Sequence, residues 1–452
     1  MSDRKLIAIP MVAGIVLTGG VAFAEQPSTD KVVKQLEARI AELEAKQQTT
    51  VTKADLSASV ASVLDDAEKR STLLQAGTPT AGFLDGKFTI ASADGAYTFN
   101  PTAQFQFRSV FNYVETDDDD EATHGFELRR MKFGFEGSVI DEKLKYKFVL
   151  QNSRSNGNTS LQDAFISYMF SDAWGFRVGQ FKDPVFHEEL TSSSRQLAVD
   201  RSLANEVLGG GLTDRVQGVA LLYNEGKLRG EVAFHDGIGS INSNFQDADV
   251  DFVQSVGGGL SVTEEANYGF GGRVEYMVLG DSWRPYRDFT ARGTEEDILV
   301  IGAGADYTEA GDTYTVSYTV DGQYENATGL GVFAAFLGKY TDFGEDLAGD
   351  DVDGADFGVV LQVGYAIPDT NYEVFGRYSG IFLDDDLVAA DDEDVINEIT
   401  AGFNYYFKSH NAKMTIDVVY LPDGLNASNS GLGLLSSEDD QFAIRGQFQL
   451  VL

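Results

Sequence analysis

The sequence has no cysteine among its 452 residues, which excludes disulfides, thiol chemistry and cysteine metal sites. It has only four histidines, His124, His187, His235 and His410, and no two stand at the spacing of metal ligands. Lysine and arginine are also scarce, 34 against 71 aspartates and glutamates, which gives a formal net charge of -37. Such an acidic chain repels phosphate backbones, so nucleic acid is not an expected partner.

Long apolar runs are scarce too, and the one exception lies at the N-terminus. Arg4 and Lys5 precede a mostly apolar run over residues 6–21, and the small residues that a signal peptidase reads follow in the sequence AFA. We therefore predict a signal peptide over residues 1–24, with a membrane anchor as the alternative. No later stretch approaches the roughly 20 apolar residues of a spanning helix. The mature chain is therefore either soluble outside the cytoplasm or a membrane β-barrel.

Residues 25–76 have helical periodicity. A 3–4–3 spacing, which is typical of a coiled-coil seam, relates Val33, Leu36, Ile40 and Leu43. A second stretch with helical spacing covers residues 56–74. These features predict a periplasmic coiled-coil segment, and the alternative is a helix that lies on its own domain. Residues 77–100 are the expected linker that leads into the next domain.

From residue 83 onward the apolar period changes from 3.6 to 2, which is the period of a β-strand. Phe107, with Gln106 and Arg108 on either side, is one example. Sixteen such segments start near residues 101, 125, 143, 160, 174, 215, 227, 268, 297, 313, 329, 356, 371, 397, 412 and 441. The predicted fold is all-β, a sixteen-stranded antiparallel transmembrane β-barrel over residues 101–452. A soluble β-sandwich or propeller is the alternative.

The connections between these segments favour the membrane barrel. Alternate connections are long and acidic, such as residues 384–395, and those between them are short turns, such as residues 368–370. Long outer loops and short inner turns are the asymmetry of outer-membrane barrels. Two connections break this pattern: the inner one at residues 280–296 is long, and the outer one at residues 308–312 is short.

Several motifs resemble the phosphate-selective porin O and P family. They are LRRMKFG at residues 128–134, LQDAFI at 161–166, RVGQFKDP at 177–184, ELTSS at 189–193, RYS at 377–379, NEIT at 397–400 and NYYF at 404–407. The resemblance covers residues 83–452 in family order, although the chain ends in Leu452 where the family usually has an aromatic residue. It implies a trimer of sixteen-stranded barrels, in which the third outer loop folds inward to narrow each pore. It also implies passive passage of solutes, with anions favoured in the best-known members.

Cationic side chains on the inward strand faces are the expected pore lining. Lys143, Lys145 and Lys147 alternate with apolar residues, so all three are predicted to point into the lumen. The further candidates for pore lining and anion binding are Arg108, Arg129, Arg177, Lys182, Arg215 and Arg377. A cationic ladder in a narrow pore lowers the barrier for anions. The alternative is a generic polar lining, balanced by acids such as Glu231 and Glu398.

The third outer loop, residues 183–214, is the constriction that the resemblance implies. Its Arg195 and Arg201 can pair with phosphate or carboxylate oxygens, or with neighbouring acids and merely hold the loop. The other candidate residues of the constriction are Glu188, Glu189, Thr191, Ser192 and Ser193. Gly302 and Gly304 lie in a strand pattern and open no helix, so they do not predict a nucleotide-binding fingerprint.

The predicted function is a passive, water-filled porin for small hydrophilic solutes in the outer membrane of a Gram-negative-type envelope, with a preference for anions such as phosphate. No Ser/His/Asp set and no paired carboxylates stand out, so we expect no enzyme, no catalytic residue, no metal site and no cofactor. The expected partners are outer-membrane lipid, small anionic solutes, copies of the chain in a homotrimer, and the cell wall through the coiled coil. The alternative is a general or cation-leaning porin with a mainly structural role, whose coiled coil tethers the outer membrane to the wall.

Overall fold

The computed structural model describes residues 33–41, 79–84, 87–115, 121–244, 249–253, 261–345, 351–384, 388, 393–437 and 439–452. The chain divides into two compact units, residues 1–76 and residues 77–452. In the first unit, residues 33–41 form a helix on which Val33, Leu36 and Ile40 are exposed. This helix shows no coiled coil within the described residues. The predicted signal peptide, Leu43 and the second helical stretch lie outside them.

The described part of the second unit is dominated by one antiparallel sheet of nineteen strands. They are β1 (Thr80–Leu84), β2 (Lys87–Ala91), β3 (Thr98–Val114), β4 (Glu121–Val139), β5 (Asp141–Asn152), β6 (Thr159–Met169), β7 (Trp174–Lys182), β8 (Arg215–Glu225), β9 (Leu228–His235), β10 (Asp249–Val253), β11 (Ser261–Leu279), β12 (Ile298–Ala310), β13 (Thr313–Glu325), β14 (Leu330–Glu345), β15 (Asp351–Ala366), β16 (Tyr372–Phe382), β17 (Val395–Lys408), β18 (Ala412–Leu421) and β19 (Gln441–Val451). The other described elements are α3 (His187–Leu190), α4 (Leu203–Leu208), α5 (Gly210–Thr213) and the 3-10 helix η1 (Pro285–Arg287). Within the described ranges, no helix has both the length and the apolar character needed to cross a membrane.

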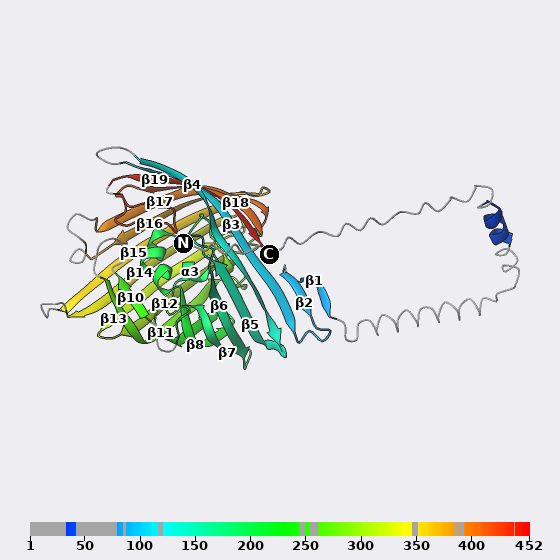
Figure 1. Cartoon of the computed structure of the whole chain (residues 1–452), viewed down its shortest axis with the longest axis horizontal. Helices are drawn as coiled ribbons and strands as arrows, with labels where there is room; N and C mark the ends of the chain where they lie inside the picture. The colour runs from blue at the N-terminus through cyan, green and yellow to red at the C-terminus, as the bar shows by residue number, and fades with distance from the viewer. Residues whose placement is uncertain are drawn as a thin grey trace, which may run out of the picture. The chain divides into compact units, whose positions relative to one another are not determined.

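Sixteen of the described strands form a closed barrel (Figure 1). Strands β1, β2 and β10 lie outside the ring, and β9 pairs directly with β11. The ring closes where β19 pairs with β3, with Phe448 opposite Phe107. The predicted sixteen-stranded antiparallel barrel is therefore confirmed.

Each predicted strand coincides with an observed one, and the differences are largest at outer strand ends. Strand β11, for example, begins at Ser261 rather than near Tyr268, because its polar outer extension pairs with β10. The two exceptional connections are also present. The short outer turn joins Ala310 to Thr313 through Gly311, whose φ of 58° is readily adopted by glycine.

The two faces of each strand differ in polarity, and the polar face points inward. Phe107 on the outside is 39% exposed, whereas the neighbouring Arg108 on the inside is 0% exposed. A soluble protein buries its apolar side chains, so this arrangement is inverted. It is the pattern of a barrel whose outer surface faces lipid.

Three connecting segments fold into the barrel and fill part of its interior. The third outer loop packs Phe186 and Leu208 against Phe333 and Leu337 of β14. The inner connection after β11 adds Phe289 to the same cluster. The outer loop after β18 adds three more buried residues, Leu425, Leu432 and Leu434. The open part of the lumen is therefore displaced toward the opposite wall.

Glycines on the inner wall allow the third outer loop to approach closely. Gly304 of β12 faces the loop, and a Cβ there would lie 2.5 Å from the backbone oxygen of Val185 and 2.9 Å from its Cα. Only glycine leaves room for this backbone. The neighbouring inward residue Gly302 leaves room for the guanidinium of Arg273 in the same way.

Candidate functional site

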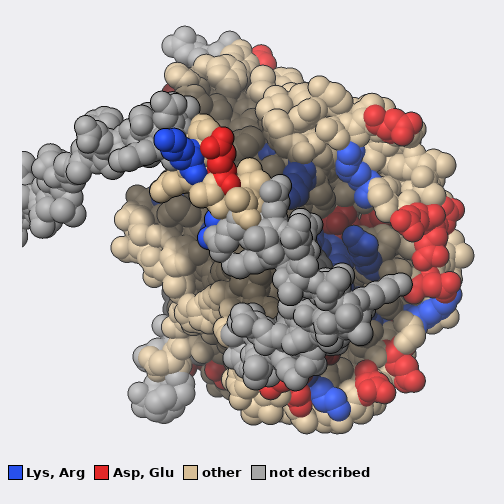
Figure 2. Space-filling view, turned by 90° about the vertical axis from the view of Figure 1, so that its right-hand side faces the viewer, with Lys and Arg blue, Asp and Glu red and all other residues tan. Residues whose placement is uncertain are grey.

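The open part of the lumen is a cavity of about 870 Å³. It is lined by inward residues of strands β3 to β8, by the third outer loop and by the C-terminal residue Leu452. Viewed from the end of the barrel where the C-terminus lies, Lys and Arg side chains are visible inside the opening, and Asp and Glu are frequent on the rim (Figure 2).

One aspartate of the third outer loop neutralises a cluster of wall arginines. Asp200 contacts Arg108 of β3 and both Arg129 and Arg130 of β4, the last two at 3.1 and 2.9 Å. Burial by itself raises the pKa of the Asp200 carboxyl, but the positive charges of the three arginines outweigh burial and hold that pKa below its usual range. Arg108 and Arg129, which were predicted from the sequence to bind anions, are thus paired with a carboxylate of the protein itself.

A β-bulge explains why two consecutive arginines point inward. The register between β3 and β4 shifts between Gln106 and Phe107, which pair with Arg130 and Leu128 respectively. Arg129 is the extra residue, so the alternation of faces is interrupted there. Strict period 2 predicts only one inward residue of the two, and only Arg129 was among the candidates.

Four other candidate arginines are also paired with acids. Arg177 contacts Glu231 at 2.7 Å, Arg201 contacts Glu189 at 3.0 Å, Arg215 contacts Asp163 at 2.8 Å and Arg377 contacts Glu398 at 2.7 Å. Arg201 also donates to the backbone oxygens of Glu188, Glu189 and Thr191. These pairs match the balanced polar lining and the loop-holding role that the sequence left open as alternatives.

The candidate lysines fall into two groups. Lys147 and Lys182 line the cavity, and each contacts one acid, Asp163 at 3.0 Å and Glu189 at 3.2 Å respectively. Lys143 and Lys145 are exposed near the inner turn before β5 and do not line the cavity.

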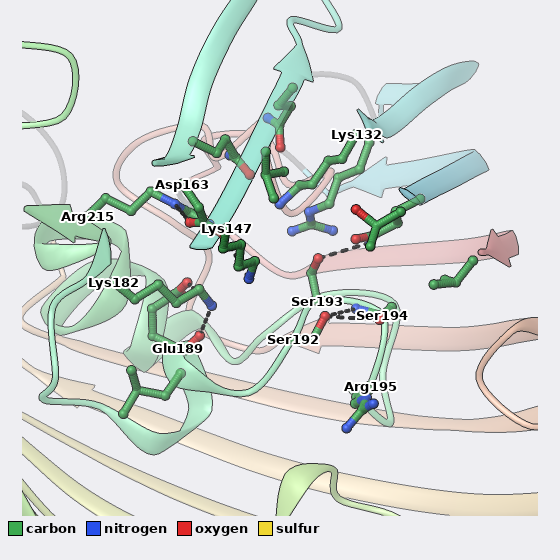
Figure 3. Close-up of a pocket in the computed structure, with 18 of the residues that line it drawn as sticks. Lys132, Lys147, Asp163, Lys182, Glu189, Ser192, Ser193, Ser194, Arg195 and Arg215 are labelled. Atoms are coloured by element: carbon green, nitrogen blue, oxygen red, sulfur yellow. Dashed lines mark hydrogen bonds and ion pairs between the residues drawn. The ribbon is translucent and has the colours of Figure 1, made fainter. Parts of the chain in front are cut away.

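Three cationic side chains line the cavity without a carboxylate partner among the described residues. They are Lys132 of β4 and Arg195 of the third outer loop, which are both partly exposed, and Arg284 of the long inner connection, which is exposed. Figure 3 shows Lys132 and Arg195 on opposite sides of the same opening. Lys132 was not among the sequence candidates, although its alternation with Met131 and Phe133 could have identified it as an inward residue.

The serines of the third outer loop lie between Lys132 and Arg195 (Figure 3). Ser192 is exposed to the cavity, and its hydroxyl lies 3.0 Å from that of Ser194. The hydroxyl of Ser193 accepts a hydrogen bond from Gln104 at 3.0 Å. Thr191 is buried and does not line the cavity.

The two acids of helix α3 hold the loop in place. Glu188 accepts hydrogen bonds from the backbone and the hydroxyl of Ser202, at 2.8 and 2.7 Å. Glu189 pairs with Lys182 and Arg201 and lies at the edge of the cavity. Both acids are buried.

The long inner connection braces the third outer loop from the other side. The ring of Tyr286 stacks on that of His187, with centroids 4.1 Å apart and an interplanar angle of 8°. His187 also lies 2.7 Å from the side-chain oxygen of Gln323 on the wall. The inner connection at residues 280–296, which breaks the length pattern of the sequence, therefore contacts the third outer loop.

Solved structures of porins have the same fold. The anion-selective porin from Comamonas acidovorans is 13% identical, with a TM-score of 0.53, over 79% of this chain and 100% of that chain. OmpF of Salmonella typhi, solved with daunomycin, is 16% identical, with a TM-score of 0.52, over 78% of this chain and 98% of that chain. OprB of Pseudomonas putida is 11% identical, with a TM-score of 0.52, over 78% and 94%.

Sequence comparison gives the family. A protein of Aquifex aeolicus described as uncharacterized is 24% identical over 267 residues, or 57% of this chain, and the chain spans 62% of that relative's length. The profile of the phosphate-selective porin O and P family matches residues 102–346. The predicted family, outer-membrane location and lack of enzymatic activity are confirmed. The chain belongs to the phosphate-selective porin O and P family of outer-membrane β-barrel channels.

Proposed function

We propose that the protein is a passive, water-filled channel for small hydrophilic solutes, with a preference for small anions such as phosphate. The observation that carries this preference is that Lys132 and Arg195, together with Arg284, line the cavity without a carboxylate partner in the described part of the chain. Inside a narrow passage, an uncompensated cation attracts anions and repels cations at short range.

The serines beside Arg195 support an oxyanion as the solute. An anion that enters a constriction loses part of its hydration shell, and hydrogen-bond donors on the wall have to replace the lost water. The exposed hydroxyl of Ser192 lies beside Arg195 on the cavity wall. A hydroxyl and a guanidinium together offer directional donors to phosphate-type oxygens.

A general or cation-leaning porin is the second candidate, and the paired arginines favour it. Asp200 and four further acids form ion pairs with seven arginines of the lumen. The whole chain carries a formal net charge of -37. If this negative charge reaches the narrowest part of the pore, it offsets the unpaired cations of the cavity. Screening over about 8 Å at physiological salt argues against a strong effect of the outer rim.

We further propose that the protein is a homotrimer in outer-membrane lipid, exported by the signal peptide of residues 1–24. The resemblance to the family supports the trimer, and the outward Phe107 and Phe111 support contact with lipid. The helix at residues 33–41, with its exposed Leu36 and Ile40, supports a coiled-coil segment that joins the chains or contacts the cell wall.

The test is the reversal potential of the purified protein in a planar bilayer under a KCl gradient. We expect the sign of an anion-selective channel, and we expect added phosphate to reduce the chloride current because the two ions compete for the same cavity. A cation-selective reversal potential at physiological ionic strength would contradict the anion preference and leave the second candidate.

A further inference from the structure

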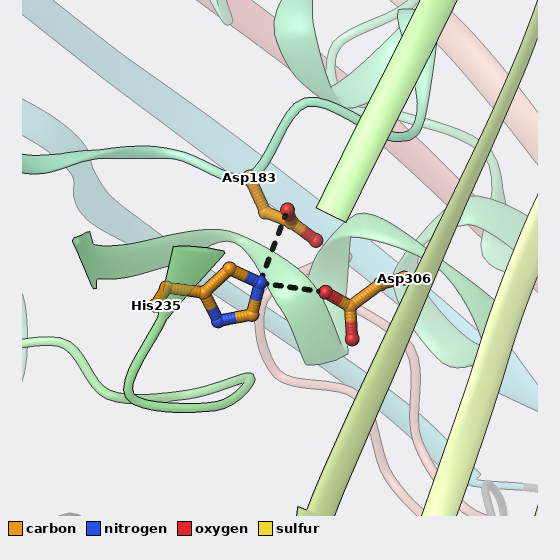
Figure 4. A group of neighbouring side chains, drawn as sticks. All are labelled: Asp183, His235 and Asp306. Atoms are coloured by element: carbon orange, nitrogen blue, oxygen red, sulfur yellow. Dashed lines mark hydrogen bonds and ion pairs between the residues drawn. The ribbon is translucent and has the colours of Figure 1, made fainter. Parts of the chain in front are cut away.

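Three ligand-type side chains meet inside the barrel, away from the cavity. Asp183 is the first residue of the third outer loop, His235 ends β9 and Asp306 lies in β12. Nε2 of His235 lies 2.8 Å from Oδ2 of Asp306 and 3.9 Å from Oδ1 of Asp183. All three side chains are 0% exposed, and they point toward one another (Figure 4).

The charges of this group are not balanced by its surroundings. Among the described residues, no hydrogen-bond donor reaches either carboxylate oxygen of Asp183. Nδ1 of His235 accepts a hydrogen bond from the backbone N–H of Gly237 at 3.1 Å, so the ring is neutral and holds its proton on Nε2. Two buried carboxylates therefore share one neutral imidazole. Buried charges are normally paired or bound to a metal.

The surrounding residues provide room and orient one ligand. A Cβ at Gly271 would meet Oδ1 of Asp183 and lie 3.3 Å from Oδ2 of Asp306, so the absence of a side chain there keeps the space between the carboxylates free. The hydroxyl of Thr308 donates to Oδ1 of Asp306 at 2.8 Å and leaves Oδ2 directed at His235. Such outer hydrogen bonds are typical of the carboxylates in metal sites.

We propose that Asp183, His235 and Asp306 together bind one divalent cation at the root of the third outer loop. One imidazole nitrogen and two carboxylate oxygens suit a borderline cation such as Zn²⁺ better than Ca²⁺ or Mg²⁺, which prefer oxygen ligands alone. The cation neutralises both carboxylates and ties the loop to β9 and β12. The cysteine-free sequence with its four scattered histidines gave no sign of this site, because the three ligands come from distant segments.

Binding requires one local rearrangement. The neutral ring holds a single N–H proton, so the cation can bind Nε2 only when that proton moves to Nδ1 by exchange with solvent, and no proton is released overall. Nδ1 can no longer accept from Gly237, so the peptide between residues 236 and 237 has to turn its carbonyl toward the ring. Gly237 has a φ of 95°, and glycine also adopts the negative φ that the turned peptide needs.

The experiment measures Zn²⁺ on the full-length, untagged protein in detergent, because a histidine tag would bind the metal itself. After chelation and dialysis, we expect titration with Zn²⁺ to load one ion per chain and to raise the temperature of unfolding. Asp183→Asn and Asp306→Asn should each abolish this tight binding. The matched control Asp172→Asn, which alters an exposed aspartate in an inner turn, should bind as the unaltered protein does.

Two results would overturn the proposal. One is no Zn²⁺ binding by the unaltered protein beyond that of the two site variants. The other is an Asp183→Asn protein that is more heat-stable than the unaltered protein with Zn²⁺ present, because Asp183 would then simply hold a proton. If the Asn variants do not fold, Gly271→Ala fills the space and keeps all three ligands, and it should also lose the ion.

Discussion

The carboxylate of Asp200 accepts a hydrogen bond from Nη1 of Arg130 at 2.9 Å and so joins the third outer loop to strand β4 inside the barrel. Arg108 and Arg129 contact the same carboxylate. One loop residue thus both anchors the third outer loop and cancels much of the positive charge on one wall. Changes at Asp200 should therefore alter stability and selectivity together.

Asp200→Asn should destabilise the barrel and increase its preference for anions. Removing one partner of a buried ion pair costs about 3–5 kcal/mol. Three arginines would lose the charge of Asp200, and of these Arg108 keeps its contact with Glu127. We expect a lower temperature for the loss of the folded band on electrophoresis and a reversal potential shifted toward anions. Asp369→Asn is the control, because it makes the same chemical change in an exposed inner turn. A shift toward cations would contradict the charge-cancelling role.

Acid should weaken this anchor only below the ordinary pKa of aspartate. The arginines hold the pKa of Asp200 below its usual range, despite burial. An aspartate with a lowered folded pKa adds stability that is fully present above the unfolded pKa of about 3.9, and this stability is lost as the pH falls toward the folded value. We expect this contribution, taken as the difference in melting temperature between the parent and Asp200→Asn, to stay constant from pH 7 to about 5 and to shrink below pH 4. A constant difference below pH 4 would mean that this ion cluster does not stabilise the fold.

Gly304→Ala should destabilise the docked third outer loop. The new Cβ would meet the backbone of Val185, which cannot rotate away as a side-chain end can. Overpacking of this kind costs about 1–3 kcal/mol. Gly446→Ala is the matched control, because a Cβ there meets nothing within 4 Å. Equal melting temperatures for the two variants would show that the loop does not pack on this glycine.

The architecture could be predicted from the sequence because the barrel imposes period 2 on every strand. Phe107 and Arg108 illustrate this, because they are adjacent and face the lipid and the lumen respectively. The alternation of apolar and polar residues in the sequence therefore indicates both faces of the strand. The polar outer ends of strands carry no such contrast. For that reason the start of β11 was placed too late, near Tyr268 rather than at Ser261.

The site was harder to predict because its contacts join residues far apart in the sequence. The bulge at Arg129 allows both Arg129 and Arg130 to point inward, and no local sequence pattern predicts a bulge. Arg108 and Asp200 are 92 residues apart, so their pairing appears only when the loop is folded into the barrel. The sequence shows that Gly304 is a glycine within a strand. It does not show why glycine is needed there, which is the close approach of the Val185 backbone.

The N-terminal segment should join the chains without stabilising the barrel. Replacing Leu36 and Ile40 with aspartate would place charges on the proposed seam, so we expect the coiled coil to weaken and the barrel to stay folded. The measurement is native mass spectrometry together with the melting temperature of the barrel. Lys34→Asp is the control, because residue 34 lies off the seam. A monomer already present in the unaltered protein would contradict the proposed trimer.

The proposed anion preference depends on the cations that lack a carboxylate partner, and Lys132 is the one on the barrel wall. Lys145 is its matched control, because it carries the same charge on the next strand but does not line the cavity. A unit charge at about 4 Å in water is worth about 1 kcal/mol, which corresponds to about fivefold in a permeability ratio.

The most direct measurement compares the reversal potentials of Lys132→Gln and Lys145→Gln in bilayers under the same KCl gradient. We predict that Lys132→Gln lowers the anion-to-cation permeability ratio by about fivefold, whereas Lys145→Gln leaves it close to that of the unaltered protein. Equal ratios for the two variants would contradict the claim that unpaired cations of the cavity set the selectivity of this channel.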